Sequence, residues 1–402
     1  MDVPQPVCYK RGAGWGVGRI TRMGIRVLMT AAVTVLAAAA CGGRRPVIGV
    51  VLPETGVASV YGASIKSGVQ LAFAGLAASP ASPIAIEFRD SASDPTRAAG
   101  AAEALYRAGA LLVIGGATTA EARAILPIAE KYERLLLSPS ASAPELTRGS
   151  PFVARVYPSD ELEGVAAADF LARLDGPEAI LIVQEDNDYT RGLLPIFLAE
   201  LGNRGGRVAA VLRTDEGGWE DRLRRALARG QTAGVYVCGY GDAILAALMA
   251  IDEAGFEGVV CTTSAINAAP FLRRAGALAE GVVFPLAGLD LGTREEPART
   301  FIRRYHETYD LFPDTYAAHG YDAALVAIAV FEGERPRSGA EVRRRLHALR
   351  DRRGVMGELA FDERGNVQLE LRLHEVLHGK VQPCGRCTAG GGHVASPVEV
   401  TR

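Results

Sequence analysis

Aromatic residues and an excess of positive charge are both missing from this chain of 402 residues. Phe, Trp and Tyr make up 6% of the sequence, and 44 Lys and Arg are balanced by 46 Asp and Glu, for a net charge of −2. Proteins that bind nucleic acids present a basic face, and those that bind single strands add aromatic stacking platforms. The composition therefore excludes a nucleic acid as partner, while an apolar content of 49% predicts a folded globular protein.

A long hydrophobic run occurs only once, from Val27 to Ala40. Its 14 residues are too few for a membrane-spanning helix, which needs roughly 20. Basic residues precede the run and small residues end it, as in a secretory signal peptide, so we predict that residues 1–40 direct export and are removed. Residues 1–22 do not resemble an export signal, and translation from Met23 would give a more usual one. Met1 and Met23 are therefore two alternative starts of translation.

Cys41 directly follows the small residues Ala38–Ala40, and this arrangement resembles the lipobox of bacterial lipoproteins. In a lipoprotein this cysteine is lipidated, and two or more acyl chains would hold the protein stably at a membrane surface. The alternative is plain cleavage after Ala40, with Cys41 incidental. Beyond residue 40 there are 39 basic and 45 acidic residues, so the mature protein carries a net charge of −6. We expect it in the periplasm or at the cell surface, anchored by lipid.

Catalytic and metal-binding motifs are also scarce. His374–His378 matches HExxH, but it continues an alternating, strand-like pattern, in which positions four apart lie roughly 13 Å from each other. One zinc ion cannot join two histidines at that distance. Cys384 and Cys387 form an isolated CxxC, which we interpret as a local disulfide or two free thiols, and Cys238 and Cys261 end apolar runs and are expected to pack in the core. The sequence therefore predicts no enzyme, no metal and no cofactor.

Short β-branched runs alternate with longer helical stretches from Arg45 onward. Continuous apolar strands, each followed by a helix, indicate parallel sheets covered on both faces. About four such units precede Ser150 and about five follow it, so we predict an α/β protein with two doubly wound, Rossmann-like domains. The predicted strands are Val47–Leu52, Ile84–Phe88, Leu111–Ile114, Leu135–Ser138, Ala179–Gln184, Gly206–Leu212, Gly234–Cys238, Gly258–Thr262 and Gly281–Phe284.

The loops after these strands are rich in Gly, Ser, Thr and Tyr, and in such folds ligands bind at the carboxyl ends of the strands. Near the end of the chain, alternating apolar residues from Val367 to Leu373 predict another strand, followed by a turn at Gly379-Lys380. Residues 382–402 are rich in Gly, Ser and Thr, and we predict that they are disordered.

Several segments resemble the type I periplasmic binding proteins of the branched-chain amino acid (leucine/isoleucine/valine) ABC transporter family. The most specific match is Ser138-Pro-Ser-Ala-Ser-Ala-Pro-Glu-Leu-Thr147, which is close to the family's SPxAxxPxLT stretch. The resemblance extends from about residue 46 to 381. Other matching segments are Ile48–Gly62, Phe88–Pro95, Ile114–Thr119, Tyr316–Ala324 and Gly357–Gly365.

This resemblance implies two lobes joined by a three-strand hinge that close on a ligand like a clamp. Lobe 1 would comprise residues 46–157 plus 287–355, and lobe 2 residues 158–286 plus 356–381. The implied function is that of the extracytoplasmic substrate-binding lipoprotein of an ABC importer, a monomer whose partners are a small polar solute and separate permease and ATPase chains. The alternative is a ligand-sensing module for a signalling partner.

The resemblance also implies the binding residues. In amino acid-binding relatives, Ser and Thr hydroxyls and backbone N–H groups hold the ligand carboxylate, an arrangement suited to anions at helix N-termini. The corresponding residues here are Thr118, Thr119, Ser140 and Ser142, and we expect Thr119 also to cap its helix. Residues at the aromatic positions of the cleft are Tyr61, Tyr189 and Tyr240.

Ser264 departs from the family pattern, because amino acid binders have a carboxylate at this position that pairs with the ligand's ammonium group. An unpaired buried ammonium costs several kcal/mol, so a small carboxylate or amide fits better than a free amino acid unless another acid substitutes. The candidates for that acid are Glu54, Asp160, Asp186, Asp188 and Asp242.

Overall fold

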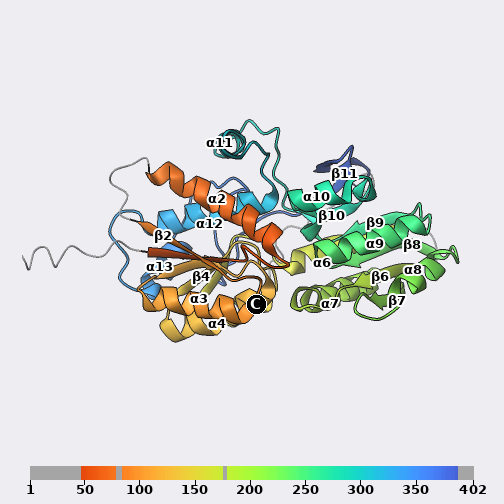
Figure 1. Cartoon of the computed structure of the whole chain (residues 1–402), viewed down its shortest axis with the longest axis horizontal. Helices are drawn as coiled ribbons and strands as arrows, with labels where there is room; N and C mark the ends of the chain where they lie inside the picture. Colours follow the sequence, from red (N-terminus) through yellow and green to blue (C-terminus); the bar gives the residue numbers. More distant parts are fainter. Residues whose placement is uncertain (1–46, 78–83, 175–178, 388–402) are drawn as a thin grey trace, which may run out of the picture. The chain divides into compact units, whose positions relative to one another are not determined.

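The computed structural model describes residues 47–77, 84–174 and 179–387. They form two β-sheets, and helices cover both faces of each (Figure 1). The predicted α/β architecture with two doubly wound lobes is therefore confirmed. Cys41 and the predicted signal peptide lie outside the described residues.

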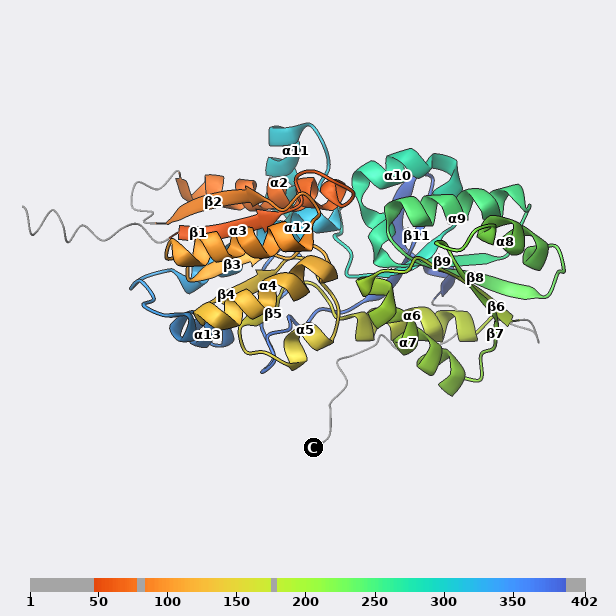
Figure 2. The ribbon, with the colours of Figure 1, turned by 60° about the horizontal axis from the view of Figure 1, so that its bottom comes forward.

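Sheet A has five parallel strands in the order β2-β1-β3-β4-β5. Helices α3 and α4 cover one face, and α2 and α12 cover the other (Figure 2). The strands are β1 (Val47–Leu52), β2 (Ala85–Asp90), β3 (Leu112–Gly115), β4 (Leu135–Ser138) and β5 (Val153–Arg155). The helices on this side are α2 (Ser59–Ala77), α3 (Pro95–Arg107), α4 (Thr119–Tyr132), α5 (Glu145–Arg148), α11 (Ala298–Tyr309), α12 (Thr315–Val330) and α13 (Gly339–His347).

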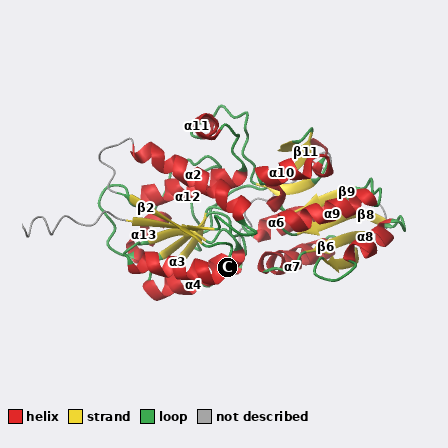
Figure 3. Ribbon diagram, in the orientation of Figure 1, coloured by secondary structure: helices red, strands yellow, loops and turns green. Residues whose placement is uncertain are grey.

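Sheet B has seven strands in the order β12-β11-β10-β9-β8-β6-β7, of which β11 and β12 run antiparallel to their neighbours. Helices α6 and α7 lie on one face, and α8 and α9 on the other (Figure 3). The strands are β6 (Ala179–Gln184), β7 (Val208–Arg213), β8 (Thr232–Cys238), β9 (Val259–Thr262), β10 (Val283–Leu286), β11 (Arg372–Leu377) and β12 (Lys380–Pro383). The helices are α6 (Asp160–Ala172), α7 (Asp188–Asn203), α8 (Trp219–Leu227), α9 (Gly241–Glu253) and α10 (Ala269–Ala275), with short 3₁₀ turns at Ser264–Asn267, Gly276–Ala279 and Gly385–Cys387.

Burial on both faces explains why central strands such as β1 and β3 are apolar throughout. Val51 of β1 packs with the core of α3 and α4, whereas Val50 and Leu52 point to the opposite core. A strand buried on both sides has no solvent face and needs no polar alternation. Each of the predicted strands before residue 290 overlaps an observed one.

The chain passes between the two sheets more than once. It leaves sheet A after β5, returns after β10 to form α11, α12 and α13, and rejoins sheet B at β11. On this last passage Asn366 pairs with Arg155 of β5 in a parallel bridge. This threading agrees with the implied hinge, and the exact lobe boundaries stay a prediction.

Two predictions about the C-terminal part need correction. The last long strand begins at Arg372 rather than Val367, because residues 367–371 make only isolated bridges. Residues 382–387 are ordered, since they pair in β12 and close a disulfide between Cys384 and Cys387. The prediction of disorder is therefore wrong for these six residues, and residues 388–402 lie outside the described part.

The strand assignment of the HExxH match is confirmed. His374 and Glu375 lie on β11, and His378 follows it with a positive φ of 53°. Cys238 and Cys261 are free and fully buried, as predicted for packing residues. No described helix combines the length and the apolarity needed to span a bilayer.

Candidate functional site

Loops from both sheets meet around a small cavity of about 20 Å³, here called the interlobe pocket. Seven of the eight predicted ligand-binding residues line it, and Thr119 does not. Their proposed role in binding stays a prediction. The lining residues are Tyr61, Ala117, Thr118, Ser140, Ser142, Tyr157, Tyr189, Tyr240, Ser264, Ala265 and Tyr316.

The N-terminus of α4 forms one wall of the pocket. Thr118, not Thr119, caps this helix. Its hydroxyl accepts a hydrogen bond from the N–H of Glu121 at 3.2 Å, and the Glu121 carboxylate accepts one from the N–H of Thr118. Thr119 is buried, and its hydroxyl has no partner among the described residues. The capping expectation for Thr119 is wrong by one residue, because the helix begins at Thr119 itself rather than after it.

Ser140 and Ser142 lie beside this helix end, in the loop after β4. The Ser140 hydroxyl donates to the carbonyl of Ala117 at 2.6 Å. The helix end and the hydroxyls provide partial positive charge, which favours an anion. No Lys, Arg or His of the described chain lines the pocket, so neutral donors would have to hold any carboxylate there.

Five tyrosines form a continuous arc around the pocket. Ring centroids are 5.0 Å apart for Tyr189 and Tyr240, 5.8 Å for Tyr240 and Tyr61, 4.9 Å for Tyr61 and Tyr316, and 6.1 Å for Tyr316 and Tyr157. Burial raises the pKa of every one of these phenols, so all stay protonated and can both donate and accept. The sequence analysis did not identify Tyr157 or Tyr316.

Tyr61 connects the two sides. It lies in the first turn of α2, and its hydroxyl donates to the carbonyl of Ala265 at 3.3 Å and accepts from the N–H of Gly241 at 3.1 Å. Ala265 and Gly241 both follow strands of sheet B, so this one phenol links the two lobes.

Behind Ser264 lies an acid that the sequence analysis missed. Glu163 of α6 is 2% exposed and accepts hydrogen bonds from the N–H and the hydroxyl of Ser264, each at 2.8 Å, and from the Tyr189 hydroxyl at 3.1 Å. Burial raises its pKa, and these three donors oppose that shift. A signal was present in the sequence, because Glu163 stands directly before the small, apolar stretch Gly164–Ala168.

Of the five acids considered from sequence, none lines the pocket and only Asp160 is buried. Burial, followed by the charge of Glu163, raises the pKa of Asp160 strongly, and the Ser142 hydroxyl opposes that shift. The other four pair with basic side chains: Glu54 with Lys66, Asp186 with Arg191 and Arg213, Asp188 with Arg123, and Asp242 with Arg274.

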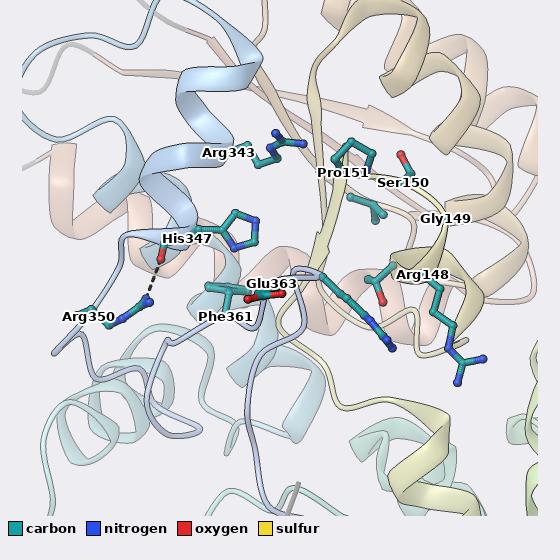
Figure 4. Close-up of a pocket in the computed structure, with 12 residues that line it drawn as sticks. Arg148, Gly149, Ser150, Pro151, Arg343, His347, Arg350, Phe361 and Glu363 are labelled. Atoms are coloured by element: carbon teal, nitrogen blue, oxygen red, sulfur yellow. Dashed lines mark hydrogen bonds between the residues drawn. The ribbon is translucent and has the colours of Figure 1, made fainter. Parts of the chain in front are cut away.

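A larger cavity, of about 590 Å³, lies elsewhere, and Arg343 and His347 of α13 lie across it from Ser150 and Pro151 (Figure 4). It is open to solvent, and its lining comes from sheet A elements and the segment after α13, so closure of two lobes would not enclose a solute there. In addition, no group of three or more His, Cys, Asp or Glu within residues 47–77, 84–174 and 179–387 could hold a metal ion.

Comparison with known proteins gives consistent matches. A sequence profile described as "Periplasmic binding protein" matches residues 47–379. The Leu/Ile/Val-binding protein BraC3 of Rhizobium johnstonii is 28% identical over 193 residues, which are 47% of this chain and about half (52%) of that relative. A leucine-, isoleucine-, valine-, threonine- and alanine-binding protein of Pseudomonas aeruginosa is 23% identical over 69% of this chain and 74% of its own length.

Solved structures agree with these sequence matches. A leucine-binding protein from Thermotoga maritima superposes with a TM-score of 0.77 and 26% identity, covering 84% of this chain and 97% of its own. A solute-binding protein from Rhodopseudomonas palustris in complex with benzoate gives a TM-score of 0.74 at 20% identity, over 84% and 95% of the two chains. At that identity the second match supports the fold alone.

Proposed function

We propose, since this chain belongs to the periplasmic binding protein family and to its branched-chain amino acid group, that it captures a small solute bearing a carboxylate or amide for an ABC importer. Members of this family are exported solute-binding proteins rather than enzymes. The observation that carries the proposal is the interlobe pocket, in which neutral donors from sheet A lie opposite tyrosines and Ser264 from the other lobe.

The sheet A wall suits the anionic end of such a solute. The N-terminus of α4 provides donors without a basic side chain, and Ser142 and Ser140 add hydroxyls, of which that of Ser140 must first turn away from the Ala117 carbonyl. Hydrogen bonds to a charged acceptor contribute about 1.5–3 kcal/mol each, enough to select a carboxylate or amide oxygen. The tyrosine arc then supplies apolar contact area for the rest of a small molecule.

The solute would drive closure of the lobes. A ligand shifts a conformational equilibrium only through a difference in affinity between the two states. Here the contacts of Tyr61 with Ala265 and of Tyr157 with Ser264 close the pocket to about 20 Å³, so they must part to admit a solute, which then gains contacts from both lobes as the lobes close around it.

We further propose that Cys41 carries the lipid anchor that keeps the protein beside its permease. Cys41→Ser should then move the protein from the membrane fraction to the soluble fraction, whereas Cys238→Ser should not. Equal distribution of the Cys41→Ser and unchanged proteins would contradict the anchor. The sensing alternative differs in its partner: co-purification with a signalling protein instead of a permease would support it.

The test of the binding function is a thermal-shift panel with leucine, leucinamide, 4-methylpentanoate and benzoate. A ligand present at 100 times its Kd should raise the free energy of unfolding by about 2.7 kcal/mol. Ser140→Ala should weaken the best ligand about tenfold or more. Ser150→Ala is the matched control, since Ser150 lies outside the interlobe pocket. Absence of any shift across the panel, or full affinity in Ser140→Ala, would contradict the proposal.

A further inference from the structure

Glu163 is positioned to act on the pocket without lining it. Its Oε1 atom accepts from the N–H of Ser264 and from the Tyr189 hydroxyl, and its Oε2 atom accepts from the Ser264 hydroxyl. A backbone N–H can only donate, so the geometry uses the carboxylate as an acceptor. No Lys or Arg of the described chain forms an ion pair with this buried group.

The hydrogen bonds around Glu163 have a common direction. The Tyr157 hydroxyl donates to the Ser264 oxygen at 2.9 Å, which in turn donates to Glu163, and Tyr189 donates to Glu163 directly. Both phenol protons are therefore directed away from the pocket, while both phenols line it. The Tyr189 oxygen keeps acceptor capacity for another group, and the Tyr157 oxygen keeps the capacity that its hydrogen bond with Tyr316 leaves. Hydrogen bonds in such a chain strengthen one another.

The negative charge of Glu163 affects the pKa of these phenols. After burial, it is the largest cause that raises the pKa of Tyr157 and of Tyr189, and it also raises that of Tyr316. Three donors, the N–H and hydroxyl of Ser264 and the Tyr189 hydroxyl, converge on the Glu163 carboxyl group and favour its charged form.

We infer that Glu163 is a positioning residue for specificity: through Tyr157, Ser264 and Tyr189 it makes this end of the pocket an acceptor for a cationic N–H donor on the solute. Ser264 has no negative charge of its own, and Glu163, which accepts hydrogen bonds from it, supplies that charge. This inference rests on the proposed function, and it predicts that solutes with a second anionic group at this end are rejected.

The test uses two ligand pairs whose members differ in the α-ammonium group alone: leucine with 4-methylpentanoate, and phenylalanine with 3-phenylpropanoate. Dissociation constants are measured by isothermal titration calorimetry on the full chain. We expect the ammonium-bearing member to bind at least about tenfold more tightly, the ratio typical of a hydrogen bond to a charged group.

Two variants then separate specificity from structure. Glu163→Gln removes the charge, and Tyr157→Phe removes one acceptor oxygen while leaving Glu163 in place, so the second variant serves if the first does not fold. Both should reduce the ratio within a pair to about threefold or less. Glu375→Gln is the matched control, because Glu375 is a buried glutamate on β11 that pairs with Arg386 outside the pocket.

A merely structural role of Glu163 would weaken both members of a pair equally and leave the ratio unchanged, and that result would overturn the inference. Tighter binding of the deaminated members to the unchanged protein would overturn it too, while leaving the proposed function intact. If no member of either pair binds while leucinamide or benzoate does, the inference is contradicted and the proposed function stands; if nothing in the thermal-shift panel binds either, both are contradicted.

Discussion

The hydroxyl oxygen of Tyr61 lies 3.3 Å from the carbonyl oxygen of Ala265, a residue 204 positions later in the chain. The same hydroxyl accepts from the N–H of Gly241, so Tyr61→Phe removes two hydrogen bonds that join the lobes. Each contributes about 0.5–1.5 kcal/mol, and their loss should weaken solute binding about tenfold. Calorimetry measures the affinity, and the radius of gyration from small-angle scattering should increase as the open form gains population.

The control for this change is Tyr132→Phe. Tyr132, the last residue of α4, donates to Glu103 of α3, so its variant loses a phenol hydroxyl without touching the pocket. If Tyr61→Phe kept the affinity of the control, the contact between Tyr61 and Ala265 would have no part in closure.

Close packing of α2 on α12 depends on glycine. A Cβ atom at Gly320 would lie 2.3 Å from the carbonyl oxygen of Ile65, and backbone atoms cannot move aside without separating the two helices. Gly320→Ala should therefore destabilise the protein by about 1–3 kcal/mol or more, measured by urea unfolding. Gly100→Ala in α3 meets no atom within 4 Å and should instead stabilise by about 0.5–1 kcal/mol. Equal effects of the two substitutions would contradict the packing argument.

Much of this fold could be predicted from sequence because its central strands are buried on both faces. Runs such as Val47–Leu52 have no polar alternation, which distinguishes them from surface strands. The pocket residues that follow such strands, among them Ser140 and Tyr240, could be placed by the same rule, since the carboxyl ends of parallel strands meet.

Two of the missed residues come from a passage without that signal. Tyr157 and Glu163 lie in the passage from β5 to α6, where an Ala- and acid-rich helix shows no clear apolar face. The three-residue strand β5 is also too short to form a recognisable run. No local sequence pattern specifies how distant segments approach each other. The order of the rings in the tyrosine arc and the hydrogen bonds from Ser264 to Glu163 both depend on that approach.

Arg155 supports the loop that carries Ser142. Its buried guanidinium donates to the carbonyls of Ser142 and Ala143 at 2.5 and 2.9 Å and to the Asn366 side chain at 2.8 Å. Burial lowers the pKa of Arg155 to about 10, so it stays charged at neutral pH.

Arg155→Lys keeps that charge but cannot reproduce three donors in fixed directions. The unsatisfied acceptors should lower the free energy of unfolding by about 2–4 kcal/mol, measured by urea titration. Arg303→Lys, on the exposed face of α11 in a pair with Glu307, should change it by less than about 0.5 kcal/mol. A loss in Arg155→Lys no larger than that of Arg303→Lys would show that the loop does not depend on the guanidinium.

Asp322 should make stability depend on pH in the opposite sense to an ordinary ion-paired carboxylate. It is fully buried on α12, where it accepts from the N–H groups of Val355 and Met356, and burial raises its pKa from 3.8 to about 7. The folded state therefore holds a proton that the unfolded state has already lost in this range. The contribution of Asp322 to the free energy of unfolding is fully present below pH 3.8 and is lost as the pH rises to about 7. Between these values the free energy of unfolding falls by about 1.4 kcal/mol per pH unit.

Asp322→Asn cannot titrate, so the difference in unfolding free energy between the unchanged protein and this variant should fall steadily from pH 4 to 7 and then level off. Urea unfolding at intervals of half a pH unit measures it, and the subtraction cancels the other titrating groups. Asp252→Asn, on the exposed side of α9, removes the same charge without disturbing a buried group. A difference for Asp322→Asn that is flat, or that rises with pH, would mean that Asp322 is charged in the folded protein throughout this range. Its two backbone donors would then outweigh the cost of its burial.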